Sequence, residues 1–137
     1  MRRSTFETVR EILKDYPGID KYIEQRKEEI KFPYRSEDLN RDIKGSLTNN
    51  AMDGYIITQE QDKRLIALER QKNVINKVYS EANHDQQVII DELYFKKHPL
   101  YTPQGLAENV LCISRSQLYK LRNEFFVKVA VDLGLPL

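Results

Sequence analysis

The sequence predicts an all-α protein, on the evidence of its composition, its hydrophobic periodicity and its helix-capping motifs. The 137 residues are rich in Glu, Lys, Arg, Leu and Ile and contain only five Gly and five Pro, a balance that favours helix over sheet. Apolar residues recur at spacings of three and four in several segments, as on one face of a helix. We expect an N-terminal helical hairpin, a long central helix and a C-terminal helix-turn-helix.

The N-terminal segment, residues 1–33, predicts two short helices. Ser4 and Glu7 have the spacing of a capping box, and a single apolar stripe follows them. Pro17 is placed to open a second helix, which Pro33 would end. The apolar face of this second helix would hold Ile19, Tyr22, Ile23 and Ile30. Neither helix is long enough to be stable alone, so we expect the pair to fold back on itself or to pack on another element.

A polar connector and a long helix follow. Residues 34–57 lose the periodicity and contain turn-forming Ser, Asn and Gly, which predicts a connector between partly independent parts. Residues 58–82 regain the periodicity and predict a helix of several turns. Its stripe nearly follows a heptad, with Gln61, Leu65, Leu68, Lys72, Ile75, Tyr79 and Ala82 as candidate seam positions. A coiled-coil dimer seam is one interpretation; we favour packing within the monomer, because the run is short and Lys72 interrupts it.

Capping residues divide residues 83–137 into three further helices. The predicted N-caps are Asn83, which has Gln86 at capping-box distance, Thr102, which precedes Pro103, and Ser114. The predicted ends are the segment 96–99 for the first of these helices and Gly134 for the last. Residues 83–137 are therefore predicted to form one domain.

The stretch from Thr102 to Phe125 has the order of elements that a helix-turn-helix requires, with a short helix, a tight apolar turn and a capped longer helix. Leu106, Ala107 and Val110 would face inward on the first helix, and Ile113 would fill the turn. Leu118, Leu121 and Phe125 would hold the second helix on the core.

The first turns of the last helix carry side chains that suit DNA. Arg and Lys pair with guanine or with phosphates, and Gln and Asn pair with adenine. The candidate DNA-binding residues are Arg115, Ser116, Gln117, Tyr119, Lys120, Arg122, Asn123 and Thr102, with Arg115, Gln117 and Lys120 as the first choices. Residues 115–128 hold four basic side chains against Glu124 alone, so this segment is basic although the formal net charge of the chain is only +1.

This segment resembles the region-4 DNA-binding domain of sigma factors, through Tyr94-Phe95, Leu106-Ala107-Glu108 and Ile113-Ser114-Arg115. Over nearly its full length, with Tyr16-Pro17 in the first segment, the chain is similar to the RinA-type and ArpU-type regulators of phages and prophages of Gram-positive bacteria. The segment from Ala107 to Ser114 is one residue longer than the common pattern, and Leu111 or Cys112 occupies the turn position that often holds Gly.

The resemblance implies a transcriptional activator of late phage genes for packaging, structure and lysis. Its partners would be double-stranded promoter DNA and host RNA polymerase, in the cytoplasm of a bacterial host. The N-terminal hairpin and the helix over residues 58–82 would mediate dimerisation or contact with the polymerase. A site-specific recombination accessory factor is a further interpretation with the same DNA-binding prediction.

The rival interpretation is a helical protein-interaction module of phage packaging or assembly, which would oligomerise through the last helix. It is motivated by the apolar run Phe125-Phe126-Val127 with Val129, Val131 and Leu133. This run holds more apolar residues than one helix face needs for packing within its own domain.

Catalytic, metal-binding and membrane-spanning classes are not expected. Cys112, in an apolar turn, is interpreted as a buried small hydrophobe, and together with His84 and His98 it provides too few ligands for a typical zinc site. No phosphate-binding loop or catalytic triad pattern is present, so we predict that the protein is not an enzyme and needs no cofactor or metal. No apolar stretch has the length of a signal peptide or membrane span, and the protein is expected to stay soluble in the cytoplasm.

Overall fold

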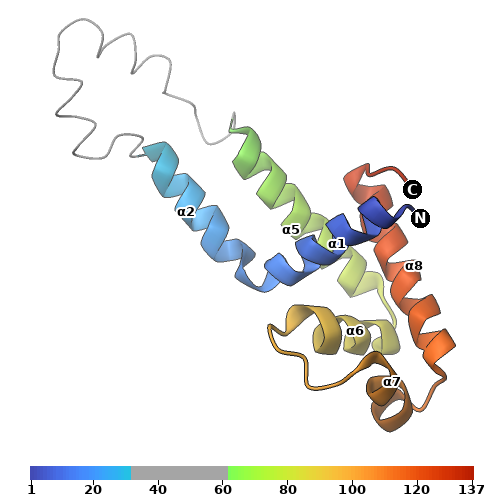
Figure 1. Ribbon diagram of the computed structural model, residues 1–137. Coiled ribbons are helices and arrows are strands. Elements are labelled where there is room, and N and C mark those ends of the chain that lie inside the picture. Colours follow the sequence, from blue (N-terminus) through green and yellow to red (C-terminus); the bar gives the residue numbers. More distant parts are fainter. Residues whose placement is uncertain (32–61) are drawn as a thin grey trace, which may run out of the picture. The chain divides into compact units, whose positions relative to one another are not determined.

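The computed structural model describes residues 1–31 and 62–137, which form helices and connecting turns without a β-strand (Figure 1). The helices are α1 (Arg3–Asp15), α2 (Ile19–Lys31), α5 (Lys63–Glu81), α6 (His84–Ile90), α7 (Pro103–Leu106) and α8 (Arg115–Leu133). A 3₁₀ turn, η1 (Tyr16–Gly18), follows α1, and the π-helical turns η2 (Asp91–Phe95) and η3 (Ala107–Leu111) extend α6 and α7. The all-α prediction is confirmed.

The chain divides into two compact units. The first contains residues 1–19 and 70–137, and the second contains residues 20–69. This grouping differs from the boundaries at residues 33, 57 and 82 that the sequence pattern suggests, because α1 packs with α8 and η2. The pairing of the first two helices as a hairpin stays a prediction, and the connector over residues 34–57 lies outside the described residues.

The main core of the first unit is built where α1, α5, η2 and α8 meet. Its fully buried side chains include Val9 and Leu13 from α1, Ile75 from α5, and Phe125 and Phe126 from α8. Apolar residues four apart lie on one face of a helix, so Val9 and Leu13 point into this core together. Because Ile75 is buried here, this part of the apolar stripe over residues 58–82 is used inside the chain.

Local sequence signals set most helix ends. Asn83 and Gln86 form the predicted capping box, with the Gln86 N–H donating to Asn83 Oδ1 at 2.8 Å. Helix α5 ends at Glu81, one residue before the predicted end at residue 82. The last helix ends at Gly134, as predicted, and its φ of 75° is a left-handed conformation that glycine adopts readily.

Two expectations for the N-terminal segment are wrong. Ser4 does not cap the first helix, because the backbone already turns helical at Arg3 and the carbonyl of Arg2 accepts from the Phe6 N–H at 3.0 Å. Tyr22 is exposed rather than part of an apolar face, whereas Ile19 and Ile23 are buried. Residues 19 and 23 are separated by one helical turn, and Tyr22 lies far enough around the helix to reach solvent.

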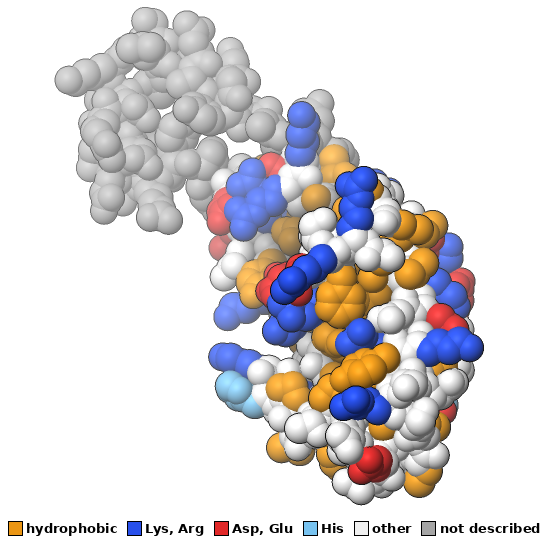
Figure 2. Space-filling view, turned by 45° about the vertical axis from the view of Figure 1, so that its right-hand side comes forward, with side chains coloured by type: hydrophobic (Ala, Val, Ile, Leu, Met, Phe, Trp, Pro, Cys, Tyr) orange, Lys and Arg blue, Asp and Glu red, His pale blue; other side chains and the backbone are white. Residues whose placement is uncertain are grey.

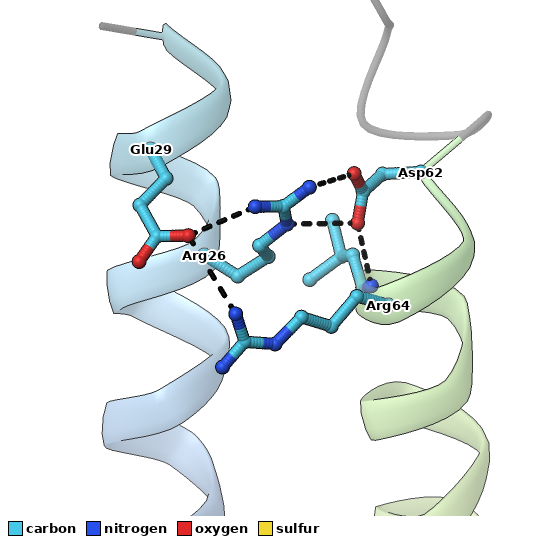
Figure 3. A network of polar contacts seen from close by, with 5 residues as sticks. Arg26, Glu29, Asp62 and Arg64 are labelled. Atoms are coloured by element: carbon cyan, nitrogen blue, oxygen red, sulfur yellow. Dashed lines mark hydrogen bonds and ion pairs between the residues drawn. The ribbon is translucent and has the colours of Figure 1, made fainter. Parts of the chain in front are cut away.

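In the second unit, Asp62 joins α2 to the start of α5 (Figure 3). The buried Asp62 carboxylate accepts from the Leu65 N–H at 2.8 Å and from Arg26, whose Nε and Nη2 donate at 3.0 and 2.5 Å. Arg26 also pairs with Glu29 at 2.9 Å. The two-pronged hydrogen bond from Arg26 lowers the pKa of Asp62 from 3.8 to about 2, against the opposing effect of burial. Asp62 is thus both a helix cap and one partner of a partly buried ion pair.

We predict that Asp62→Asn destabilises the protein by about 1–2 kcal/mol at pH 7, since the amide can cap α5 but cannot pair with the Arg26 charge. A carboxyl with a lowered folded-state pKa stabilises the fold above pH 3.8 and loses that contribution as the pH falls towards 2. The gap between wild type and Asp62→Asn should therefore close between pH 4 and 2 in urea unfolding followed by circular dichroism. Glu28→Gln, at an exposed position of α2, is the control; a gap that persists unchanged at pH 2 would contradict the prediction.

Candidate nucleic-acid interface

The candidate interface is built on α7, the turn after it, and α8. The Thr102 hydroxyl caps α7 by accepting from the Gly105 N–H at 3.0 Å, and Pro103 occupies the first helical turn, as predicted. The Ser114 hydroxyl caps α8 by accepting from the Gln117 N–H at 3.1 Å. Local hydrogen bonds thus fix where both helices begin. Because the start of α8 is fixed, helical geometry determines the directions of the side chains in its first turn.

A second apolar cluster fastens α7 and α8 to α6. Its buried members are Ile89, Leu106, Ala107, Leu118 and Leu121, with Ile113 partly buried against them. The predicted inward positions Leu106, Ala107, Leu118, Leu121 and Phe125 are confirmed. Buried Gln86 adds a polar tie that the sequence analysis did not identify, since its side-chain amide donates to the Leu121 carbonyl at 3.1 Å. Only its cap spacing with Asn83 was visible in the sequence.

The segment between Ala107 and Ser114 accommodates its length through η3. The Cys112 and Ile113 N–H groups both donate to the Ala107 carbonyl, Ile113 at 3.0 Å. A π-helical turn holds one residue more than an α-turn between its bonded groups, so η3 takes up one more residue before Ser114 than an α-turn would.

Two expectations for this turn are wrong for the same reason. Val110, predicted to face inward, is 43% exposed, and Cys112, predicted to be buried, is exposed. The wider turn rotates Val110 away from the cluster and leaves Cys112 to reverse the chain, with φ 55° and ψ 43°. Cys112 therefore occupies the left-handed position for which glycine is the usual residue.

The structure separates the eight candidate DNA-binding residues into two groups. The side chains exposed to solvent are Arg115, Ser116, Gln117, Lys120, Asn123 and Thr102. Of these, Thr102 has its hydroxyl oxygen engaged in the α7 cap. Tyr119 and Arg122 are only partly exposed, because each packs against other side chains of the first unit.

Arg122 is held by contacts on several sides. Its guanidinium carbon lies 4.7 Å from the centre of the Tyr119 ring and 4.8 Å from that of Phe6 on α1. Its Nε and Nη2 donate to Asn123 Oδ1 at 3.2 and 2.9 Å. Burial chiefly raises the pKa of Tyr94, and the nearby Arg122 charge opposes this effect. The role of Phe6 in this site escaped the sequence analysis, since no periodicity links residues that lie so far apart in the chain.

An open hollow runs along one side of α8. Its lining residues are Ser116, Tyr119, Lys120, Asn123, Glu124, Val127 and Lys128. A neighbouring hollow is lined by Met1, Arg3, Phe6, Arg122, Asn123 and Val127. Asn123 lines both hollows. Figure 2 shows Lys and Arg side chains interleaved with hydrophobic side chains over the face that turns towards the viewer.

The apolar run in the second half of α8 is largely used within the chain. Phe125, Phe126 and Val129 are buried in the main core, whereas Val131 is 55% exposed. The run needs more than one helix face because α8 contacts both α1 and α6. The feature that motivated an oligomer seam is therefore accounted for mostly by packing inside one chain.

The described ranges, 1–31 and 62–137, contain no group of three or more His, Cys, Asp or Glu residues placed to hold a metal ion. None of the helices in these ranges combines the length and the apolar content that crossing a membrane requires.

Comparison with known proteins identifies a family. Residues 6–131 match the family described as "Protein of unknown function (DUF722)". The chain belongs to this family. A search of the curated proteins and a search of the solved structures each gave no match. The family match includes most of α1 and most of α8, so the contact between these helices lies inside the region that defines the family.

We predict that Cys112→Val lowers the free energy of unfolding by about 1–2 kcal/mol although the side chain is exposed, because a β-branched residue is strained in the left-handed region. Cys112→Gly should leave stability unchanged or raise it by up to about 1 kcal/mol. Urea unfolding of both variants tests this, with Glu69→Val at an exposed position of the α-helix α5 as the control. Equal stability of the Val and Gly variants would contradict the left-handed turn.

Proposed function

We propose that the protein is a transcriptional regulator that binds double-stranded promoter DNA through the first turns of α8. The observation that carries the proposal is the combination of a capped α7, a tight turn and a capped α8 whose exposed first turns present Arg115, Gln117 and Lys120. An α-helix fits the major groove, where such side chains contact base edges and phosphates.

The electrostatics of α8 support this assignment. The start of the helix carries partial positive charge from its backbone N–H groups, and Arg115 and Lys120 add full charges to the same end. A chain with a formal net charge of only +1 has weak general attraction for DNA, so binding would depend on this local surface. Such a balance suits a sequence-selective protein better than one that coats DNA.

The biological role follows from the resemblance to RinA-type and ArpU-type regulators and to sigma region 4. On that basis the protein activates late phage genes for packaging, structure and lysis, acts in the cytoplasm of a bacterial host, and contacts host RNA polymerase. It works by binding rather than by catalysis, and it needs no cofactor. The solvent-facing sides of α2 and α5 are then the surfaces proposed for polymerase contact or self-association.

We predict that Arg115→Ala combined with Lys120→Ala weakens binding to the cognate promoter at least 100-fold without unfolding the protein. Each lost phosphate contact should reduce the slope of log affinity against log salt by about 0.9. The measurement is fluorescence anisotropy with duplexes from the regions flanking the gene, against random duplexes, over a salt series.

The matched control is Lys14→Ala combined with Lys21→Ala, which removes two exposed positive charges from α1 and α2. This control should keep the wild-type affinity within about twofold. If the α8 double variant binds as tightly as the control, the assignment of α8 as the DNA-contacting helix fails. If the wild type binds no duplex selectively, the proposed function fails as a whole.

A further inference from the structure

Arg122 contacts two aromatic rings and a neighbouring amide, which together hold its guanidinium in place. Its guanidinium carbon lies over the Phe6 ring and over the Tyr119 ring, less than 5 Å from each ring centre. The edge that carries Nε and Nη2 donates twice to Asn123 Oδ1. A guanidinium has five N–H donors in a fixed plane, so these contacts fix its position and its orientation together.

These contacts also fix the side-chain amide of Asn123. An arginine can only donate hydrogen bonds, so the group of Asn123 that faces it must be the carbonyl oxygen. The amide nitrogen then points away from Arg122, on an exposed side chain that lines both surface hollows. Asn123 therefore presents a hydrogen-bond donor to solvent while its acceptor oxygen is engaged by Arg122.

We infer that Arg122 is a positioning residue, which holds the Tyr119 ring and turns the Asn123 amide so that it donates to an acceptor on bound DNA. This inference rests on the proposed function and assigns roles within the same surface. It revises the expectation that Arg122 contacts DNA itself. It also revises the pairing of Asn with adenine, because a bidentate contact to adenine needs the amide oxygen as well as the nitrogen.

The acceptor on DNA has two sources, a base edge or a phosphate. The base-edge acceptors in the major groove are guanine O6 and N7 and thymine O4, together with adenine N7 on its own. Asn123 lies eight residues beyond Arg115, about 12 Å along a helix, which is close to the width of the major groove. A helix that enters the groove by its first turns thus brings Asn123 to the rim, where phosphate oxygens and the outer base edges are both within reach.

Phe6 gives α1 a part in this arrangement. Its ring lies 4.8 Å from the ring of Phe126 on α8, as well as 4.8 Å from Arg122, so α1 provides one wall of the arginine site. A cation over an aromatic face is stabilised by the ring quadrupole, and the effect grows when the pair is withdrawn from water. The orientation of Asn123 at the candidate DNA surface therefore depends on a helix from the other end of the chain.

The test uses the intact chain and duplexes selected by the wild-type protein from a library with 20 random base pairs. Arg122→Lys keeps the positive charge but loses the planar guanidinium group and its fixed pair of N–H donors. We expect it to weaken binding about fivefold to tenfold with an unchanged salt slope, whereas Lys120→Ala lowers the slope by about 0.9. Phe6→Leu, which removes an aromatic wall far from the first turns of α8, should weaken binding in the same way. All variants are measured well below their melting temperatures.

Two variants test the donor role of Asn123. Asn123→Asp keeps the oxygen towards Arg122 but presents a carboxylate to DNA, so it should bind at least tenfold more weakly than Asn123→Ala. Repeating the selection with Asn123→Ala distinguishes the two sources. Relaxed preference at a single guanine or thymine indicates a base contact, and a uniform loss over all sequences indicates a phosphate.

Other outcomes overturn the inference. If Arg122→Lys binds like the wild type, Arg122 acts only as a charge, and the positioning role fails while the proposed function stands. If the Asn123→Ala selection relaxes a conserved adenine whose N6 amino group the wild type also requires for binding, the contact is bidentate and the donor role fails. If the wild type selects no duplex, both the proposed function and this inference fail.

Discussion

The burial of α8 along most of its length is the constraint on which the rest of the first unit depends. Leu118 and Leu121 enter the cluster with α6 and α7, and Phe125, Phe126 and Val129 enter the core with α1, α5 and η2. Each large apolar side chain contributes about 1.5–3 kcal/mol when buried. Because both clusters hold the same rigid helix, they connect the turn before α8 to α1 at the N-terminal end of the chain. The exposed first turns of α8 are therefore held in a fixed position.

The neighbouring residues Ile89 and Ile90 show how α6 serves both clusters. Ile89 packs with Leu118 in the cluster near the turn, and Ile90 packs with Phe126 in the main core, although the two are adjacent in sequence. Adjacent positions on a helix lie about 100° apart, so α6 faces both clusters. The π-helical turn that follows, η2, then carries Tyr94 into the main core, where its ring packs edge-on against Phe126.

Features encoded within a few residues could be predicted from the sequence, and those set by wider geometry could not. The caps at Thr102 and Ser114 are local hydrogen bonds between residues three apart, and both were correctly predicted. Val110 was misplaced because the periodicity assumed an ordinary α-helix where the chain forms the π-helical turn η3, and Cys112 was misplaced because this turn ends in an exposed left-handed residue. The additional length of this segment was visible in the sequence, but the π-helical turn that it forms was not.

The same distinction applies to the candidate site. Its exposed residues follow from helix geometry once Ser114 is known to start α8, whereas the contact of Phe6 with Arg122 joins helices at opposite ends of the chain. A list of basic residues on α8 treats Arg122 and Lys120 alike, yet Arg122 is enclosed by aromatic rings and Lys120 is exposed. Charge alone therefore cannot rank the contacts. The ranking depends on which donors remain open to solvent after packing, and at Asn123 the packing of its neighbour determines what the side chain can offer.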